Sequence, residues 1–331
     1  MLKKPAIADA DLIGTLRDRY ALPVTEIEFL ALGYDLDAGV YRVTTDDGGA
    51  YFLKVKEGAV YLPSVVVPRY LFDRGLRQIV VPLPATDGAL ITRIDPFSLV
   101  LYPYIEHHTA SEIGLTDPQW VEFGTIVRQI HDAPLPPNVS LERETFTPSA
   151  AWRALAHEMH ARIRAETYTD PEQNALATAW RAHYAEISEL LRRADDYGRQ
   201  LRARNLPHGL CHADLHTGNL LIDRHGDLFV VDWDQPVLAP KERDLMFISG
   251  GRVITAVSQR EEDLFFSGYG PAEIDRLALI YYRCAWVVQD IGSFAEQVFL
   301  MPELSVAAKR EAIRYFVGSF APDGIADSAL Q

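Results

Sequence analysis

The octapeptide HADLHTGN, residues 212–219, carries most of the information on the fold of this chain, and Asp232 follows it thirteen residues later. Asp232 comes directly after a short apolar run, Leu228–Val231. Phosphoryl transfer needs one carboxylate beside the attacking hydroxyl, and an amide oxygen and a second carboxylate to hold magnesium ions on the nucleotide phosphates. An aspartate, an asparagine five residues later and a further aspartate supply these groups. The spacing therefore predicts a phosphoryl-transfer site.

Each of these residues has a predicted role. Asp214 is the candidate catalytic base or hydroxyl-orienting group, because the loose transition state of this reaction depends on positioning as much as on basicity. Asn219 and Asp232 are the candidate magnesium ligands, since both supply the hard oxygen atoms that this ion prefers. Asp234 is an alternative ligand, but we prefer Asp232 because it directly follows the apolar strand.

A lysine that binds the nucleotide phosphates is expected as well. Lys54 interrupts an apolar run and is the preferred candidate, while Lys56 is a rival on the same strand face. A phosphate-covering loop is expected at Gly33–Gly39, although this segment keeps only two glycines. The segment Pro63–Asp73 contains no glutamate to pair with the lysine, and Pro68 disfavours helix at the residue before it. We therefore expect Lys54 to be oriented in some other way, or the activity to be reduced.

The remaining sequence predicts an α+β, two-lobed protein-kinase-like fold. Residues 1–104 predict a strand-rich nucleotide-binding lobe, and residues 105–331 a mainly helical lobe with the catalytic loop and the acceptor site. Val100–Ile105 would form the hinge between them, and there Tyr102, Tyr104 and Ile105 are expected to contact the adenine. Short β-type runs predict strands at Ile27–Leu30, Val40–Val43, Tyr51–Val55, Ile79–Val81, Ala89–Arg93 and Leu99–Tyr104. Apolar spacing predicts helices at Ile7–Arg19, before Gly75, from Thr116 to Pro134, and at Trp152–Arg164, Asn174–Arg193 (closed near Gly198), Asp263 and Asp275–Phe299.

Composition narrows the class of protein and of partner. With 48% apolar and 24% charged residues, the 331-residue chain is typical of a soluble globular protein. A net charge of −14 argues against a nucleic-acid partner and favours a cationic small molecule. No apolar run is long enough to cross a membrane, and the N-terminus lacks a signal-like apolar stretch. With only Cys211 and Cys284, a disulfide framework is excluded, so we expect a cytoplasmic protein of unknown oligomeric state.

Further segments support a resemblance to a known family. The run DWDQPVLAPKERDLMFI, residues 232–248, follows the predicted metal ligand, and the pieces YFLKVK at 51–56, VRQIH at 127–131 and LCH at 210–212 accompany it. On these residues the chain resembles the aminoglycoside phosphotransferases, and among them the spectinomycin phosphotransferases. The similarity runs nearly from end to end, but it is patchy in the N-terminal lobe and at Glu142–Arg204.

The resemblance implies an activity. An enzyme of this kind would phosphorylate a hydroxyl of an aminocyclitol with ATP and magnesium, and would thereby inactivate an antibiotic, because a dianionic group replaces a hydroxyl donor. Asp244 is expected to brace the catalytic loop rather than to contact substrate. Asp290 and Glu296 are carboxylates that would suit substrate ammonium groups, but solvated helix positions are the plainer interpretation of each.

Three other interpretations stay open at this point. A kinase of the same fold would act on choline, homoserine, a thiosugar or another antibiotic. A metallohydrolase would use Cys211, His212, Asp214 and His216 as ligands, but no second His-rich cluster completes such a site, and Asn219 and Asp232 would have no role. We expect His212 to orient the loop backbone, and assign no role to His216. A non-catalytic nucleotide-binding module would explain the missing glutamate and the poor glycine loop.

Overall fold

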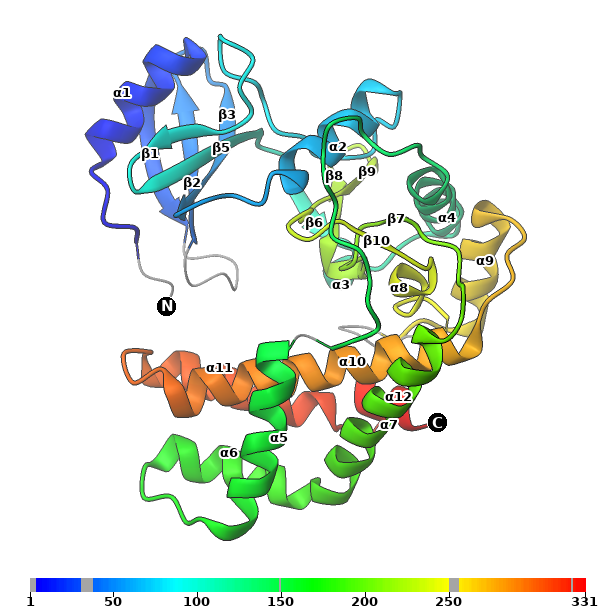
Figure 1. Cartoon of the computed structure of the whole chain (residues 1–331). Helices are drawn as coiled ribbons and strands as arrows, with labels where there is room; N and C mark the ends of the chain where they lie inside the picture. The colour runs from blue at the N-terminus through cyan, green and yellow to red at the C-terminus, as the bar shows by residue number, and fades with distance from the viewer. Residues whose placement is uncertain (1–3, 31–37, 149, 250–255, 323) are drawn as a thin grey trace. The chain divides into compact units, whose positions relative to one another are not determined.

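The chain folds into two compact units. In the computed structural model, the described residues are 4–30, 38–148, 150–249, 256–322 and 324–331, and the predicted phosphate-covering loop lies mostly outside them. The first unit comprises Met1–Leu115, Ala133–Leu141 and Gly218–Pro236, and the second comprises Thr116–Asp132, Glu142–Thr217 and Val237–Gln331. The first is rich in strands and the second mainly helical, which confirms the predicted α+β class (Figure 1).

A five-stranded antiparallel sheet forms the core of the first unit. Its strand order is β1-β2-β3-β5-β4. Helix α1 (Asp9–Tyr20) lies beside this sheet (Figure 1). It contributes Leu12 and Leu16 to the same apolar core as Leu53, Val55 and Leu99 of the strands. Strands β1 to β5 are Val24–Leu30, Ala38–Thr45, Ala50–Glu57, Thr92–Ile94 and Phe97–Pro103. Predicted strands thus occur at five of the six places proposed, with β4 and β5 offset by up to three residues.

The sixth predicted strand, Ile79–Val81, does not join this sheet. Ile79 instead makes a parallel bridge to Val230, and the Val80 N–H donates to the carbonyl oxygen of the same residue at 3.1 Å. Val230 belongs to a separate three-stranded sheet of order β6-β8-β9, formed by His107–Thr109, Leu220–Asp223 and Leu228–Val230. A short helix, α3 (Ala110–Ile113), follows β6. Segments distant in the sequence therefore hold the β8–β9 hairpin within the first unit.

Pro68 was expected to disfavour helix at Val67, but the structure has a helix there. Helix α2 runs from Pro63 to Asp73 and contains Pro68. The ring removes one intrahelical hydrogen bond, but Val65, Val67 and Leu71 are almost completely buried, and burying such side chains contributes on the order of 1.5–3 kcal/mol each. Packing therefore outweighs the local penalty.

Helices dominate the second unit, and most lie near the predicted places. Helix α4 (Asp117–His131) begins after Thr116, whose N–H donates to Gln119 Oε1 at 2.9 Å and so caps the helix. Gly268 of α9 (Gln259–Tyr269) lies where a Cβ would be 1.8 Å from the Val121 carbonyl oxygen, so α4 and α9 pack at very close range. The other helices are α5 (Ala150–Ala165), α8 (Glu242–Leu245), α10 (Arg276–Ala295), α11 (Val306–Ser319) and α12 (Ile325–Leu330), and α10 continues into a π-helical segment, Glu296–Leu300.

The single helix predicted at Asn174–Arg193 is wrong. The structure has two helices there, α6 (Pro171–Ala182) and α7 (Tyr184–Arg202), with His183 between them at φ −108° and ψ 22°. The His183 ring stacks on Phe320 at 4.6 Å, and Trp180 stacks on Phe316 at 5.3 Å. Contacts with α11 and the residue after it, rather than a local breaker, therefore set this break.

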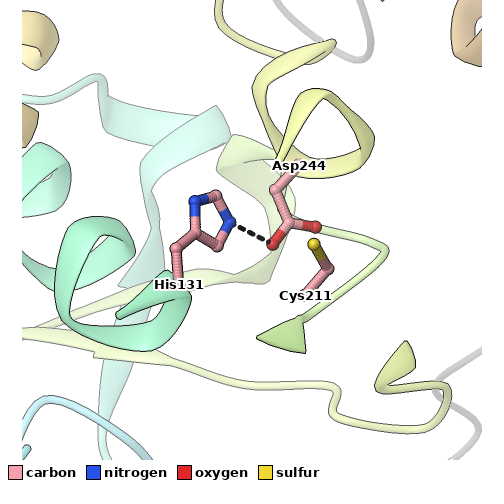
Figure 2. Close-up of side chains that lie close together, drawn as sticks. All are labelled: His131, Cys211 and Asp244. Carbon is pink, nitrogen blue, oxygen red and sulfur yellow. Dashed lines mark hydrogen bonds and ion pairs between the residues drawn. The ribbon is translucent and has the colours of Figure 1, made fainter. Parts of the chain in front are cut away.

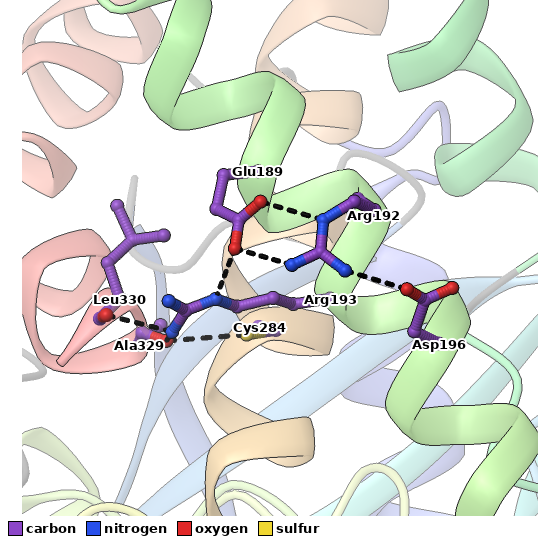
Figure 3. Close-up of polar contacts among 7 residues, drawn as sticks. All are labelled: Glu189, Arg192, Arg193, Asp196, Cys284, Ala329 and Leu330. Atoms are coloured by element: carbon purple, nitrogen blue, oxygen red, sulfur yellow. Dashed lines mark hydrogen bonds and ion pairs between the residues drawn. The ribbon is translucent and has the colours of Figure 1, made fainter.

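The C-terminal helix α12 is anchored by polar contacts (Figure 3). Arg193 Nη1 donates to the carbonyl oxygens of Ala329 at 3.1 Å and Leu330 at 2.8 Å, which satisfies the end of that helix. Arg193 Nε also donates to Glu189 Oε1 at 2.8 Å, and Arg192 binds the same carboxylate. Hydrogen bonds from these two arginines lower the pKa of Glu189 to about 2. The network joins α7 to α12.

Among the helices that the structure describes, none has the length and apolar composition needed to cross a membrane.

Candidate active site

The predicted magnesium ligands lie at the mouth of the β8–β9 hairpin. Leu220 faces Val230 in the last paired register, and one step outward the Val231 N–H donates to the Asn219 carbonyl oxygen at 3.0 Å. Asp232 is the next residue, and its φ of 65° lies in the left-handed region, a strained conformation found often at functional sites. The hairpin register thus brings Asn219 and Asp232 to one end of one element. Their amide and carboxylate oxygens fit a hard divalent ion such as magnesium.

Lys54 has a carboxylate partner that the sequence analysis did not predict for it. Strand alternation buries Leu53 and Val55 completely in the core and directs Lys54 to the opposite face. There Lys54 Nζ lies 2.5 Å from Asp234 Oδ2, with exposed fractions of 21% and 47% for the two side chains. Because α2 has no glutamate, we expected Lys54 to be oriented in some other way, and its pair with Asp234 agrees with that expectation. Because the two residues are 180 positions apart, no local pattern could have shown the contact.

The predicted adenine contacts follow the end of β5. Tyr102 packs edge-on against Phe52, and burial followed by the negative charges of Asp234 and Asp232 raises its pKa. The Tyr104 N–H donates to the Ala50 carbonyl oxygen at 3.2 Å, and the Ile105 carbonyl oxygen is 2.6 Å from His107 Nδ1. These two backbone groups are thus engaged with the protein, whereas Tyr102 lies beside the carboxylates of the hairpin mouth.

In the second unit, Asp214 sits on a loop with its side chain 34% exposed. The completely buried His212 accepts the Asp214 N–H on Nδ1 at 3.2 Å, which agrees with its expected role in orienting the backbone. His216 Nε2 lies 3.3 Å from Asp214 Oδ1. Burial raises the pKa of Asp214, but the hydrogen bond and charge of His216, with the charges of His212 and Arg243, hold it below its ordinary value. Asp214 is therefore ionised at neutral pH, as a group that orients a hydroxyl must be.

Asp244 braces this loop, as expected (Figure 2). Its two carboxylate oxygens accept the N–H groups of His212 at 2.9 Å and of Ala213 at 2.7 Å. Ala213 has a φ of 76°, so these bonds hold a strained backbone conformation directly before Asp214. On its other side Asp244 Oδ2 lies 3.0 Å from His131 Nε2. Burial raises the pKa of Asp244, but the hydrogen bond and charge of His131, with the charge and backbone N–H of His212, hold that pKa below its ordinary value. The carboxylate is thus ionised although completely buried.

The same neighbourhood contains a group of possible metal ligands, which gives no support to the metallohydrolase interpretation. Within the described residues, the ligand atoms of His131, Cys211 and Asp244 lie within 4.8 Å of one another (Figure 2). Burial, and then the charge of Asp244, raise the pKa of the Cys211 thiol well above its ordinary value. The thiol hydrogen-bonds to the Ala239 carbonyl oxygen at 3.5 Å, and His131 Nδ1 lies 2.8 Å from the Tyr269 hydroxyl. These contacts make the cluster a structural support for the loop.

Comparisons with known proteins agree with this geometry. A family model described as the phosphotransferase enzyme family matches residues 26–280. No curated protein sequence is significantly similar to the chain. The solved structure of spectinomycin phosphotransferase with ADP and spectinomycin is 28% identical with a TM-score of 0.90, and the match covers 99% of this chain and 98% of that one.

Two more distant structures share the fold alone. Amicoumacin kinase in complex with AMP-PNP and Ca²⁺ is 16% identical with a TM-score of 0.62, covering 97% of this chain and 94% of that one. Choline kinase from Streptococcus pneumoniae is 15% identical with a TM-score of 0.52, covering 94% and 99%. Because the family model matches more than half of the sequence, the chain belongs to the phosphotransferase enzyme family, as a small-molecule kinase that acts on a hydroxyl group.

Proposed function

We propose that this kinase transfers the γ-phosphoryl group of ATP to a hydroxyl of a cationic aminocyclitol antibiotic, with spectinomycin as the first candidate. The observation that carries the proposal is the Asp214 carboxylate, ionised and partly exposed on a loop whose backbone Asp244 fixes by two hydrogen bonds. The acceptor class is supported by the 28% identity to spectinomycin phosphotransferase across almost the whole chain. The net charge of −14 favours a cationic acceptor.

Each residue has one part in the proposed reaction. Asp214 orients the acceptor hydroxyl and takes its proton as the oxygen bonds to the γ-phosphorus and the bond from phosphorus to ADP breaks. Lys54, held by Asp234, binds the nucleotide phosphates. Asn219 and Asp232 are the residues that would hold magnesium, which when bound neutralises charge on the phosphates.

The nucleotide is assigned to the first unit. We assign the adenine to Tyr102, Tyr104 and Ile105, and their lobe to residues 1–104, as the sequence predicts. Since the Tyr104 N–H and the Ile105 carbonyl oxygen already have partners, adenine contacts there would come from side chains or from other backbone groups. We also propose a reducing, cytoplasmic setting, which is supported by Cys211 and Cys284 being buried free thiols.

The test measures ADP release with magnesium-ATP and a panel of acceptors: spectinomycin, several aminoglycosides, choline and homoserine. Turnover of spectinomycin alone supports the proposal as stated, while turnover of another acceptor keeps the reaction and changes the substrate. Asp214→Asn should reduce kcat at least about 10³-fold and leave ATP binding within a few-fold, because the reaction depends on that carboxylate while the nucleotide does not. Asp227→Asn, in the exposed β8–β9 turn, serves as the matched control. Near-normal turnover by Asp214→Asn would remove that residue from its role.

A further inference from the structure

A continuous row of aromatic contacts leads from the catalytic loop to helix α10. His216, which lies 3.3 Å from Asp214, meets the Phe247 ring edge-on at 5.8 Å between centroids. Phe247 in turn meets Trp286 of α10 edge-on at 5.1 Å, with an interplanar angle of 87°. Phe247 is almost completely buried, so it fixes the position of both rings. A row of three aromatic rings, His216, Phe247 and Trp286, therefore leads from the Asp214 carboxylate to α10 within the second unit.

A second carboxylate lies at the far end of this aromatic row. Asp290 lies one helical turn after Trp286 on α10, where side chains four residues apart are neighbours, and it accepts a hydrogen bond from the indole N–H. The charge of Asp214 acts on Asp290, and together with burial it raises the pKa of Asp290 to about 7. The side chain is nevertheless partly exposed. Two carboxylates that act on each other repel, and a bound cation would relieve this repulsion in addition to the charge of Arg243, which acts on Asp214.

Other charged groups lie on the elements packed against α10, and one of them, Arg243, contacts Trp286 itself. On α8, the Arg243 guanidinium lies over the rings of Trp286 at 5.4 Å and Tyr282 at 5.7 Å. Glu296, at the end of α10, accepts the indole N–H of Trp152 at 3.0 Å, which makes it part of the α5–α10 packing. On the neighbouring helices, Arg193 pairs with Glu189 (Figure 3). Arg153 pairs with Asp195, and Arg310 pairs with Glu172. Of the two acceptor carboxylates considered from the sequence, Asp290 is the one whose pKa the charge of Asp214 raises.

We propose that Asp290, with Trp286, binds the ammonium group of the acceptor and so presents its hydroxyl to Asp214. The inference rests on the proposed function and deepens it, because it names a residue that selects cationic acceptors. A carboxylate gives an ammonium group charge-assisted hydrogen bonds, and an indole ring attracts a cation through its face. The aromatic row Trp286–Phe247–His216 sets the distance between the ammonium site and the catalytic carboxylate.

The test uses Asp290→Asn, which removes the charge and keeps an oxygen that can accept the Trp286 N–H. Spectinomycin, and choline as a permanently charged second probe, are titrated calorimetrically into the protein loaded with magnesium-ADP at pH 8, and spectinomycin turnover is measured in parallel. We expect Kd and KM for spectinomycin to rise about 10- to 100-fold, with kcat and KM for ATP within a few-fold. Glu273→Gln removes the same charge from an exposed position of the same unit and should change nothing.

The outcomes separate this inference from the proposed function. Weaker binding of cations by Asp290→Asn, without turnover by either protein, keeps the ammonium site and overturns phosphoryl transfer. Unchanged Kd in Asp290→Asn, an equal loss in Glu273→Gln, or no binding of either probe by the wild type overturns the ammonium site. Trp286→Phe gives an independent check on a folded variant, since it removes the indole N–H and weakens the ring's attraction for a cation. It should raise Kd several-fold, and an unchanged Kd removes Trp286 from the site.

Discussion

Replacing Asp290 with asparagine should stabilise the protein more at alkaline pH than in acid. In the folded chain, burial and the charge of Asp214 raise the pKa of Asp290 from 3.8 to about 7. Between these two pH values the folded state holds a proton that the unfolded state has lost, so stability falls as the pH rises. The contribution of the neutral carboxyl is complete below pH 3.8 and is lost above about pH 7.

The magnitude follows from the two pKa values. At 1.36 kcal/mol per pKa unit, the gap between 3.8 and about 7 corresponds to about 4 kcal/mol at pH 8 and to about 2 kcal/mol at pH 5. Asparagine has no charge to bury. The variant's gain in the free energy of unfolding over the wild type should therefore be about 2.7 kcal/mol larger at pH 8 than at pH 5, because two pH units lie between pH 5 and the pKa of about 7.

Urea denaturation followed by tryptophan fluorescence measures this difference. Four of the five tryptophans belong to the second unit, so the signal follows the unit that carries Asp290. Both proteins are compared at pH 5 and pH 8 at equal ionic strength. A gap between variant and wild type that does not change with pH, or one that shrinks at pH 8, contradicts the burial of a charged Asp290.

Other substitutions test the remaining parts of the site and the fold. Asp232→Asn should weaken nucleotide binding by tenfold or more in magnesium and hardly at all in EDTA, because it removes a charged ligand; equal affinities in both conditions refute the metal assignment. Asp244→Ala should lower the free energy of unfolding by about 2–6 kcal/mol, since two buried loop N–H groups lose their acceptor; a thermal melt within a degree of the wild type contradicts the brace. Gly268→Ala should lower the free energy of unfolding by about 1–3 kcal/mol or more, because its Cβ would lie 1.8 Å from the Val121 carbonyl oxygen. Gly14→Ala, where a Cβ meets open space, should instead raise it by up to about 1 kcal/mol through the better helix propensity of alanine in α1. Equal melting shifts for the two glycine variants refute the close packing of α4 and α9.

The local arrangement of residues that are close in the sequence could be predicted in part. Asp214, Asn219 and Asp232 were assigned from their spacing and from the groups that phosphoryl transfer needs, and their roles stay predictions. The structure places Asn219 and Asp232 at one hairpin end through the pairing of neighbouring strands. Asp244 was also expected to brace the catalytic loop, because it follows the predicted catalytic segment closely in the sequence. In these cases the chain itself limits how far apart the groups can lie.

Contacts between distant segments could not be predicted. Asp234 was considered as a metal ligand, not as the partner of Lys54, because no local pattern reports a contact across 180 residues. Asp290 was interpreted as a solvated helix residue. Trp286 lies one turn earlier on the same helix face, but Asp214, whose charge acts on Asp290, comes from a distant part of the sequence. Helix α2 forms despite Pro68 for the same reason: the burial that outweighs the proline penalty is a property of the fold.

Binding of a cation at Asp290 should also release protons, and this links the stability prediction to the proposed acceptor site. With a pKa of about 7, about half of the Asp290 carboxyls carry a proton at pH 7 in the unliganded protein. An ammonium group favours the charged form and expels that proton, so about half a proton leaves per bound cation. Calorimetry with choline, whose charge does not titrate, in two buffers of different ionisation enthalpy counts these protons. Asp290→Asn should release none at this site. Equal binding enthalpies in both buffers for the wild type would mean that the cation does not meet Asp290. In that case the charged Asp290 carboxylate would lower the free energy of unfolding of the unliganded protein without contributing to cation binding.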